Sequence, residues 1–340
     1  MTKNQANGQK NPKWLLVETF DENEEPTIVS EGSTPKPFMK LAGMFRDNPD
    51  RRKEIRGLIN GLHRTKEPID KTVGDRRIIA HPLVLEGRLH AVWLLSGPAD
   101  MEVPRHNDAG AWIIDLTTYT ALGSQEWAAM ADLPPEHRGQ ERHIGAMFDQ
   151  VVMKDGGESR ALSLIETKTV GAGYQGDWIV ERRDGSQWRA HFSLRILDVE
   201  RGGEVHRCSV GVSQNLGDVV QDGPQSLVHL EGHYLRMARA EGEHAAIVSL
   251  RTLNFIRWVT AASDRIAWKG VAGEPAPAIH PDDLSEAILL MRRAESIGRS
   301  EGQVRVMGID GKYLSAEVVI EPVTLEGGVH AAFVLIRLEA

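Results

Sequence analysis

Histidine is the residue type with the most potential for chemistry in this sequence, since thirteen of the 340 residues are histidines. Imidazole nitrogens bind transition metals and haem iron. His137 and His143 lie six residues apart in a segment that is expected to be exposed, whereas ligands on one helix face need a spacing of three or four. His90, His206 and His330 each begin a predicted strand after a glycine-containing turn. Their recurrence indicates copying of one unit, so the sequence predicts solvated histidines and no metal or haem site.

The motifs that usually carry catalysis or cofactor binding are missing from the sequence. It has no GxSxG elbow, P-loop, HExxH pair or GxGxxG fingerprint. The segment Gly171-Ala172-Gly173 begins like a glycine fingerprint, but it follows a predicted helix and is better interpreted as a helix C-terminus. The single cysteine, Cys208, forms neither a disulfide nor a CxxC pair and is expected to be a small strand residue. We therefore expect no catalytic residue, no cofactor and no enzymatic activity.

Tryptophans gather in the middle and the C-terminal thirds of the chain. Such side chains can line a pocket for a flat apolar ligand, or they can fill a core, and core packing is the favoured interpretation. No ligand-binding residue is assigned at this stage. The six tryptophans concerned are Trp112, Trp127, Trp178, Trp188, Trp258 and Trp268.

The elements that would position these side chains occur as a repeated unit. Residues 176–188 and 302–314 each place a glycine eight residues before an Asp-Gly pair, Asp184-Gly185 or Asp310-Gly311. Asp-Gly between apolar runs predicts a β-hairpin, because glycine accepts the positive φ of a tight turn. A second signature occurs three times. It consists of a strand, a turn, and then an apolar residue followed by a histidine at the start of another strand. Each unit therefore reads as two strands, a helical middle and three strands.

The helical middles are expected at about 37–65, 125–170 and 264–300. In the first, Ile55, Leu58, Ile59 and Leu62 recur with the spacing of one buried helix face. In the third, Pro281-Asp282-Asp283 predicts a helix start, with acids near the N-terminus. The apolar face expected to follow consists of Leu284, Ile288 and Met291.

The third unit resembles a PAS domain. The resemblance rests on Ile279-His280-Pro281-Asp282-Asp283, on the hairpin Asp310-Gly311-Lys312-Tyr313 and on the two strands that follow. It extends to the second unit through the repeat and more weakly to the first, where Gly74-Asp75 stands at the turn. It implies α+β units, each a five-stranded antiparallel sheet with helices on one face. GAF domains share this layout, so the first two units can be assigned to either the PAS or the GAF family. The cysteine motif of photosensory relatives is absent.

The predicted organisation is a polar tail, three units and two linkers. The tail comprises residues 1–12, the units 13–98, 110–216 and 244–340, and the linkers 99–109 and 217–243. In the second linker an amphipathic helix is predicted from Leu227, Leu230, Tyr234 and Met237. It either mediates dimer contacts or packs on its own chain.

Composition limits the partners. The chain carries 40 Lys and Arg against 48 Asp and Glu, for a net charge of −8, which disfavours duplex nucleic acid because such binding relies on basic residues. No apolar run approaches the length of a membrane span, and the N-terminus lacks the apolar core of a signal peptide. We therefore expect a cytoplasmic protein with neither nucleic acid nor membrane as a partner.

The function that these observations favour is a tandem-PAS sensory or regulatory protein. No kinase, cyclase or helix-turn-helix segment follows the third unit, so we expect it to act through another polypeptide or a second copy. Whether it also binds a small apolar ligand is left open. The last strand is apolar on both faces, with Phe333 and Leu335 on one and Val334 and Ile336 on the other. A second chain or a neighbouring part of the same chain must cover one face. An enzyme with an unrecognised site and a purely structural scaffold are the alternatives.

Overall fold

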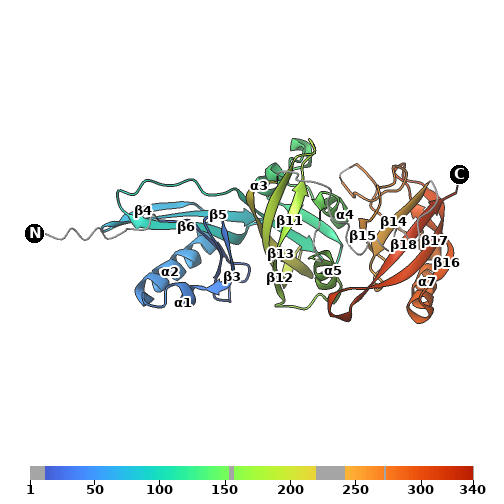
Figure 1. The fold of residues 1–340 in the computed structure, drawn as a ribbon, viewed down its shortest axis with the longest axis horizontal. Helices are drawn as coiled ribbons and strands as arrows, with labels where there is room; N and C mark the ends of the chain where they lie inside the picture. The colour runs from blue at the N-terminus through green and yellow to red at the C-terminus, as the bar shows by residue number, and fades with distance from the viewer. Residues whose placement is uncertain (1–11, 153–156, 220–241, 272, 340) are drawn as a thin grey trace, which may run out of the picture. The chain divides into compact units, whose positions relative to one another are not determined.

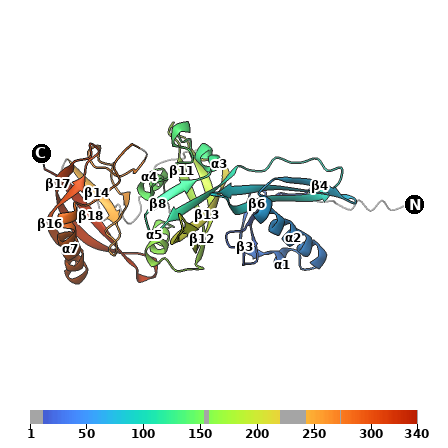
Figure 2. The same cartoon turned by 180° about the vertical axis from the view of Figure 1, so that it is seen from behind.

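The computed structural model describes residues 12–152, 157–219, 242–271 and 273–339. These residues form two compact units, one up to Ala111 and one from Trp112 onward. The structure is mainly β, with 46% strand and 21% helix. The strands make three antiparallel sheets, one in the N-terminal unit and two in the C-terminal unit (Figures 1 and 2).

The N-terminal unit is a six-stranded sheet with helices against one face. Helix α2 begins after Asn48, whose side chain accepts a hydrogen bond from the backbone N–H of Arg51. The predicted face of Ile55, Leu58, Ile59 and Leu62 is confirmed, because all four side chains are buried in the core beneath the sheet. The strand order is β3-β2-β1-β6-β5-β4. The elements are β1 (Leu15–Glu18), β2 (Thr27–Glu31), β3 (Thr34–Lys40), α1 (Leu41–Met44), α2 (Pro49–Thr65), β4 (Ile69–Val73), β5 (Arg76–Leu85) and β6 (Arg88–Pro98).

The middle sheet has seven strands in the order β10-β11-β12-β13-β7-β8-β9. Its strands are β7 (Ala109–Asp115), β8 (Thr120–Gly123), β9 (Arg142–His143), β10 (Val151–Val152), β11 (Gly173–Glu181), β12 (Gln187–Arg201) and β13 (Glu204–Asp218). Its helices are α3 (Gln125–Met130), η1 (Pro135–His137), α4 (Ile144–Phe148) and α5 (Gly157–Thr167).

The C-terminal sheet has five strands in the order β15-β14-β18-β17-β16. The strands are β14 (Glu243–Val248), β15 (Phe255–Trp258), β16 (Ser300–Met307), β17 (Tyr313–Thr324) and β18 (His330–Leu338). The helices are η2 (Pro281–Asp283), α7 (Leu284–Ile297) and η3 (Glu326–Gly328). Between β15 and η2 the chain forms a long irregular segment that returns to β16 through two isolated bridges, Ile266 with Gly308 and Ile279 with Val306.

The repeated hairpins are confirmed. Asp184 lies between β11 and β12, and Asp310 lies between β16 and β17, which are the matching strand pairs of their two sheets. Each aspartate Oδ1 accepts a hydrogen bond from the backbone N–H two residues on, at 2.8 Å from Ser186 and 3.0 Å from Lys312. Gly185 and Gly311 have φ of 80° and 78°, the left-handed conformation that favours glycine. In the N-terminal unit, Gly74-Asp75 joins the matching strands β4 and β5 in a shorter turn, in which Gly74 has a φ of 63°.

The predicted fold of three five-stranded sheets with helices on one face is wrong. The sheets have six, seven and five strands, because β3 is added at one edge of the first sheet and β9 and β10 at the edges of the second. Residues 37–40, expected to begin a helical middle, complete strand β3. Proline has no backbone N–H with which to pair a neighbouring strand. Pro35 and Pro37 are acceptable in β3 because this strand lies at the edge of the sheet and has a neighbour on one side only.

The C-terminal sheet is covered on both faces, which also contradicts the prediction. Phe333 and Leu335 of β18 share a core with α4 and α5 of the middle sheet. Val334 and Ile336 face α7 in a second core. The same chain therefore covers both faces of the last strand, and the argument for a second chain at this strand fails.

Two expectations about helices have different outcomes. Helix α7 begins at Leu284 as predicted, but its buried side chains are Ala287, Leu290, Met291 and Ala294, whereas Leu284 and Ile288 are about two-fifths exposed (42% and 41%). The linker-helix residues Leu227, Leu230, Tyr234 and Met237 lie outside the described residues. The three unit boundaries stay predictions. In the part of the chain that the structure describes, no helix is long and apolar enough to cross a membrane.

Candidate functional site

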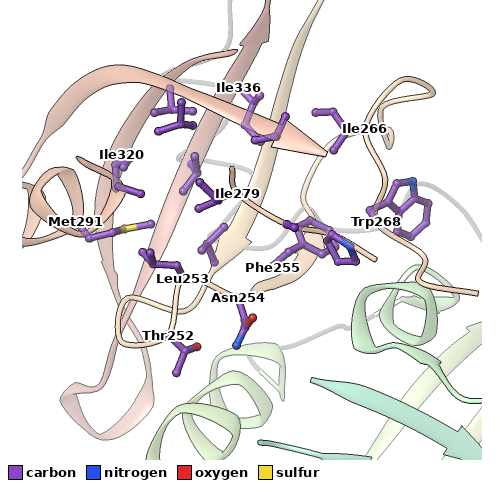
Figure 3. A pocket seen from close by; sticks show the side chains of 18 of the residues that line it. Thr252, Leu253, Asn254, Phe255, Ile266, Trp268, Ile279, Met291, Ile320 and Ile336 are labelled. Carbon is purple, nitrogen blue, oxygen red and sulfur yellow. The ribbon is translucent and has the colours of Figure 1, made fainter. Parts of the chain in front are cut away.

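A cavity of about 350 Å³ lies between the C-terminal sheet and helix α7 (Figure 3). One wall is the inner face of the sheet, which consists of aliphatic side chains that alternate along each strand with side chains of the opposite face. These lining residues are Val248, Val304, Val306, Val318, Ile320, Val334 and Ile336.

Helix α7 and the irregular segment before it close the cavity. The helix contributes Leu284, Ala287, Leu290 and Met291. The irregular segment contributes Ile266–Trp268 and Pro277–Ile279. Backbone hydrogen bonds hold both of these stretches to β16, from Ala267 N–H to the Met307 carbonyl and from Met307 N–H to the Ala278 carbonyl, each at 2.8 Å. The wall is therefore attached to the sheet at two places.

An aromatic cluster forms the end of the cavity next to the middle sheet. Phe255 lies 5.1 Å from Trp258 and 6.4 Å from Trp268, measured between ring centroids. The two tryptophans meet edge to face at 6.5 Å. The ring of His143 lies 5.7 Å from Phe255. Flat rings at these separations favour a flat or largely apolar occupant.

The polar side chains that line the cavity are few and carry no fixed charge. They are Thr252, Asn254 and His143. The aromatic side chains Trp258 and Trp268 each add an indole N–H, and that of Trp258 is buried without a partner among the described residues. Thr252 and Asn254 belong to the turn between β14 and β15, where Leu253 has a φ of 60°. The Thr252 hydroxyl is 3.2 Å from the hydroxyl of Tyr119, which lies beside the middle sheet. In the part of the chain that the structure describes, no Lys, Arg, Asp or Glu lines the cavity, so a charged group would be desolvated here without a partner from these residues.

His143 is neutral at ordinary pH. It precedes α4, and its Nδ1 accepts a hydrogen bond from the backbone N–H of Gly145 at 3.1 Å. Burial lowers the pKa of His143 to about 4, because a charged imidazolium is poorly stabilised away from water. The expectation that the segment of His137 and His143 is exposed is wrong for His143, of which only 6% is exposed.

The three histidines at matching strand positions have three different surroundings. His330 is exposed, as predicted. His206 is half-buried, and its Nδ1 lies 2.5 Å from an oxygen of the buried Asp115 carboxylate. His90 is buried beside Phe20. Among the described residues no group of three or more His, Cys, Asp or Glu could hold a metal ion.

The tryptophans divide between the two predicted roles. Trp112, Trp127, Trp178 and Trp188 are core residues of the middle sheet. Trp258 and Trp268 belong to the other core, and both also line the cavity.

Two smaller predictions about individual residues have different outcomes. Cys208 is buried on β13, as expected for a small strand residue. The prediction that Gly171 and Gly173 form a helix C-terminus is wrong, because α5 ends at Thr167 and is followed by Lys168 in the left-handed region, whereas Gly171 lies in a later turn and Gly173 begins β11.

The sequence did not indicate the cavity or its polar residues. The lining comes from β14 to β18, from α7, from an irregular segment and from the end of β9, so no short motif contains it. The only signal available beforehand was the pair Trp258 and Trp268 near a segment without regular periodicity.

The fold is similar to that of an uncharacterised protein from Mycobacterium tuberculosis. Its crystal structure matches with a TM-score of 0.79 at 23% sequence identity, over 96% of each chain. This likeness shows a shared fold. No curated protein matches the sequence.

Two signalling proteins match far more weakly. A sensory box histidine kinase/response regulator from Burkholderia thailandensis E264 gives a TM-score of 0.24 at 16% identity, over 32% of this chain and 77% of its own. An RNA-binding light-oxygen-voltage receptor gives 0.26 at 12% identity, over 68% and 95%. These values are too low to support a conclusion.

Two family models match parts of the sequence. Residues 13–105 match the model described as Rv3651-like, N-terminal. Residues 230–340 match the model described as Rv3651-like, C-terminal domain. The chain therefore carries the N-terminal and the C-terminal domain of the Rv3651-like family.

Proposed function

We propose that this protein is a sensory or regulatory binding module whose C-terminal sheet takes up a small, uncharged, largely apolar molecule. The observation that carries the proposal is the cavity of about 350 Å³ beneath that sheet. Its volume lies within the range of about 300–1,000 Å³ that is usual for small-molecule sites. Its lining is aliphatic and aromatic with three polar side chains, which is the composition that such sites have.

The cavity favours binding over the two alternatives. A purely structural scaffold calls for filled cores, since protein interiors pack densely with few large voids. An enzyme needs a nucleophile or an acid–base pair in contact with the substrate. Among the described residues, the lining contains no Ser, Cys, Lys, Asp or Glu, and His143 already uses one ring nitrogen for the helix cap. Binding without chemistry is therefore the proposed role, and any regulatory effect would pass to a protein partner.

Dye binding to the full chain tests the proposal. The probe is 1-aminoanthracene, a flat uncharged dye whose emission rises in apolar surroundings. We expect saturable binding to the wild type and a loss of at least tenfold in affinity for Ala287→Leu, because Ala287 lines the cavity from α7. Ala129→Leu is the matched control, since Ala129 is an exposed helical residue outside the lining.

The result that overturns the proposal is equally concrete. Unsaturable dye binding, or binding that Ala287→Leu and Ala129→Leu leave equally unchanged, would place the dye elsewhere on the protein. Circular dichroism of both variants shows whether the fold is kept.

A further inference from the structure

His143 lines the cavity although it belongs to the middle sheet rather than to the C-terminal one. Its backbone N–H donates to the carbonyl of Lys269 at 2.8 Å. A Cβ on Gly270 would lie 3.0 Å from the Cβ of His143, and a Cβ on Gly145 would lie 2.3 Å from the Phe255 ring. The segment after β15 therefore packs closely against the backbone and Cβ of His143, and the hydrogen bond from the Gly145 N–H to Nδ1 orients its ring.

Hydrogen bonding determines which ring nitrogen of His143 carries the proton. The backbone N–H of Gly145 points at Nδ1, so Nδ1 must present its lone pair. A neutral imidazole has one N–H, and in His143 it is therefore at Nε2. The hydrogen bonds among the described residues give this N–H no acceptor. Nε2 is not one of the fully buried atoms that lack a partner, so it keeps accessible surface on a residue that lines the cavity. An acceptor that enters the cavity can therefore pair with a donor for which the described residues provide no partner.

We propose that the Nε2–H of His143 donates a hydrogen bond to a neutral oxygen acceptor, such as a ketone or quinone carbonyl, on an otherwise apolar ligand in this cavity. The inference rests on the proposed function and narrows it to a class of ligand. A carboxylate or phosphate fits less well, because no lining side chain of the described residues carries a positive charge and an unpaired buried anion is costly. A pure hydrocarbon fits less well because it leaves Nε2–H unpaired.

A pair of probes of nearly equal shape tests the acceptor. 2-Acetylnaphthalene carries a carbonyl where 2-ethylnaphthalene carries a methylene, and each displaces 1-aminoanthracene from the full chain. We expect the wild type to prefer the ketone by about three- to tenfold, the usual range for one hydrogen bond. His143→Ser should lose this preference while keeping the affinity for the hydrocarbon, since serine still caps α4. His137→Ala, outside the lining, should keep it.

The outcomes separate this inference from the proposed function. If both naphthalenes bind equally well to the wild type, or if His143→Ser keeps the preference, the role of His143 is wrong and the binding function stands. If neither probe displaces the dye, the proposed function fails as well.

A second measurement needs no variant. In long-range ¹H–¹⁵N spectra of the wild type, His143 should show the Nε2–H tautomer, and its Nε2 resonance should shift with the ketone and not with the hydrocarbon. The Nδ1–H tautomer, or equal shifts with both probes, would contradict the proposal.

Discussion

The carboxyl group of Glu166 on α5 accepts a hydrogen bond of 3.1 Å from the hydroxyl of Ser249, just after β14. A buried acid therefore links the helix layer of the middle sheet to the C-terminal sheet. Its second oxygen, Oε1, is buried and has no hydrogen-bond partner among the described residues. Burial raises the pKa of Glu166, and the hydrogen bond from Ser249 and the nearby Lys168 and Arg251 offset this only in part.

Glu166→Gln is expected to stabilise the protein at pH 7 by about 1 kcal/mol, because it removes a buried charge with an unpaired oxygen. A raised pKa in the folded state means that the acid contributes stability below the ordinary pKa of glutamate. That contribution is lost as pH rises through the raised value. The difference in free energy of unfolding between the variant and the wild type, measured with urea, should therefore be smaller at pH 4 than at pH 7. Glu126→Gln, at an exposed residue of α3, is the control and should change little at either pH.

Acid should loosen the N-terminal unit. The Nδ1 of His81 lies 3.2 Å from the Nε2 of His106, and the two rings pack against Trp14 and Trp93. Burial is the larger cause that lowers the pKa of His81, and the nearby His106 lowers it further. A histidine with a lowered pKa contributes stability above the ordinary value, and this stability is lost as pH falls through the lowered one. Hydrogen exchange of the β5 and β6 amides should therefore accelerate from pH 7 to pH 5, after correction for intrinsic rates.

The variant His81→Phe keeps a ring beside Trp14 and removes the titration. It should flatten this pH dependence, whereas His330→Gln, at an exposed strand residue, should leave it unchanged. An equally steep dependence in His81→Phe would assign the effect to another group.

Gly145→Ala should weaken the contact between α4 and β15. The added Cβ would lie 2.3 Å from Cε1 of Phe255, so the ring or the helix must move. Overpacking of this kind costs about 1–3 kcal/mol. Gly57→Ala is the matched control, because nothing lies within 4 Å of its added Cβ in α2. It should stabilise by about 0.5–1 kcal/mol, through helix propensity. Chemical denaturation of both variants measures whether each one loses or gains free energy of unfolding. A Gly145→Ala variant that is more stable than the wild type would contradict the close packing.

Gly185→Ala and Gly311→Ala should each destabilise the protein, and by similar amounts. Both glycines occupy the left-handed region, with φ near 80° (80° and 78°), and stand at the same hairpin of two sheets. An L-residue there costs about 1–2 kcal/mol. Thermal unfolding of the two variants provides the comparison, with Gly61→Ala in α2 as the helical control. A clear loss at one hairpin and none at the other would show that the two turns are not equivalent.

The elements that the sequence predicts well are those decided by neighbouring residues. Asp184-Gly185 and Asp310-Gly311 specify their turns through a short hydrogen bond and a positive φ. Ile55 and Leu62 specify the buried face of α2 through helical spacing. In such cases the interactions span a few residues, so a pattern in one segment is sufficient.

Where prediction failed, the deciding contacts came from distant segments. The faces of β18 are equally apolar in sequence, and only packing against α5 on one side and α7 on the other shows that one chain covers both. Leu284 and Ile288 were predicted to lie on the buried face of a helix. In the structure the helix is rotated, so that Ala287 and Leu290 are the buried residues.

The sequence by itself determined the hairpins and the absence of familiar catalytic motifs, because each depends on local backbone preference or on a contiguous motif. Only the tertiary structure decided that a cavity exists beneath the C-terminal sheet and that His143, from β9, reaches it. Whether side chains fill the space between elements depends on how sheets and helices pack together, and this packing joins residues far apart in the chain. The neutral Nε2–H of His143 likewise follows from burial and from the backbone of Gly145, neither of which the spacing of histidines reveals.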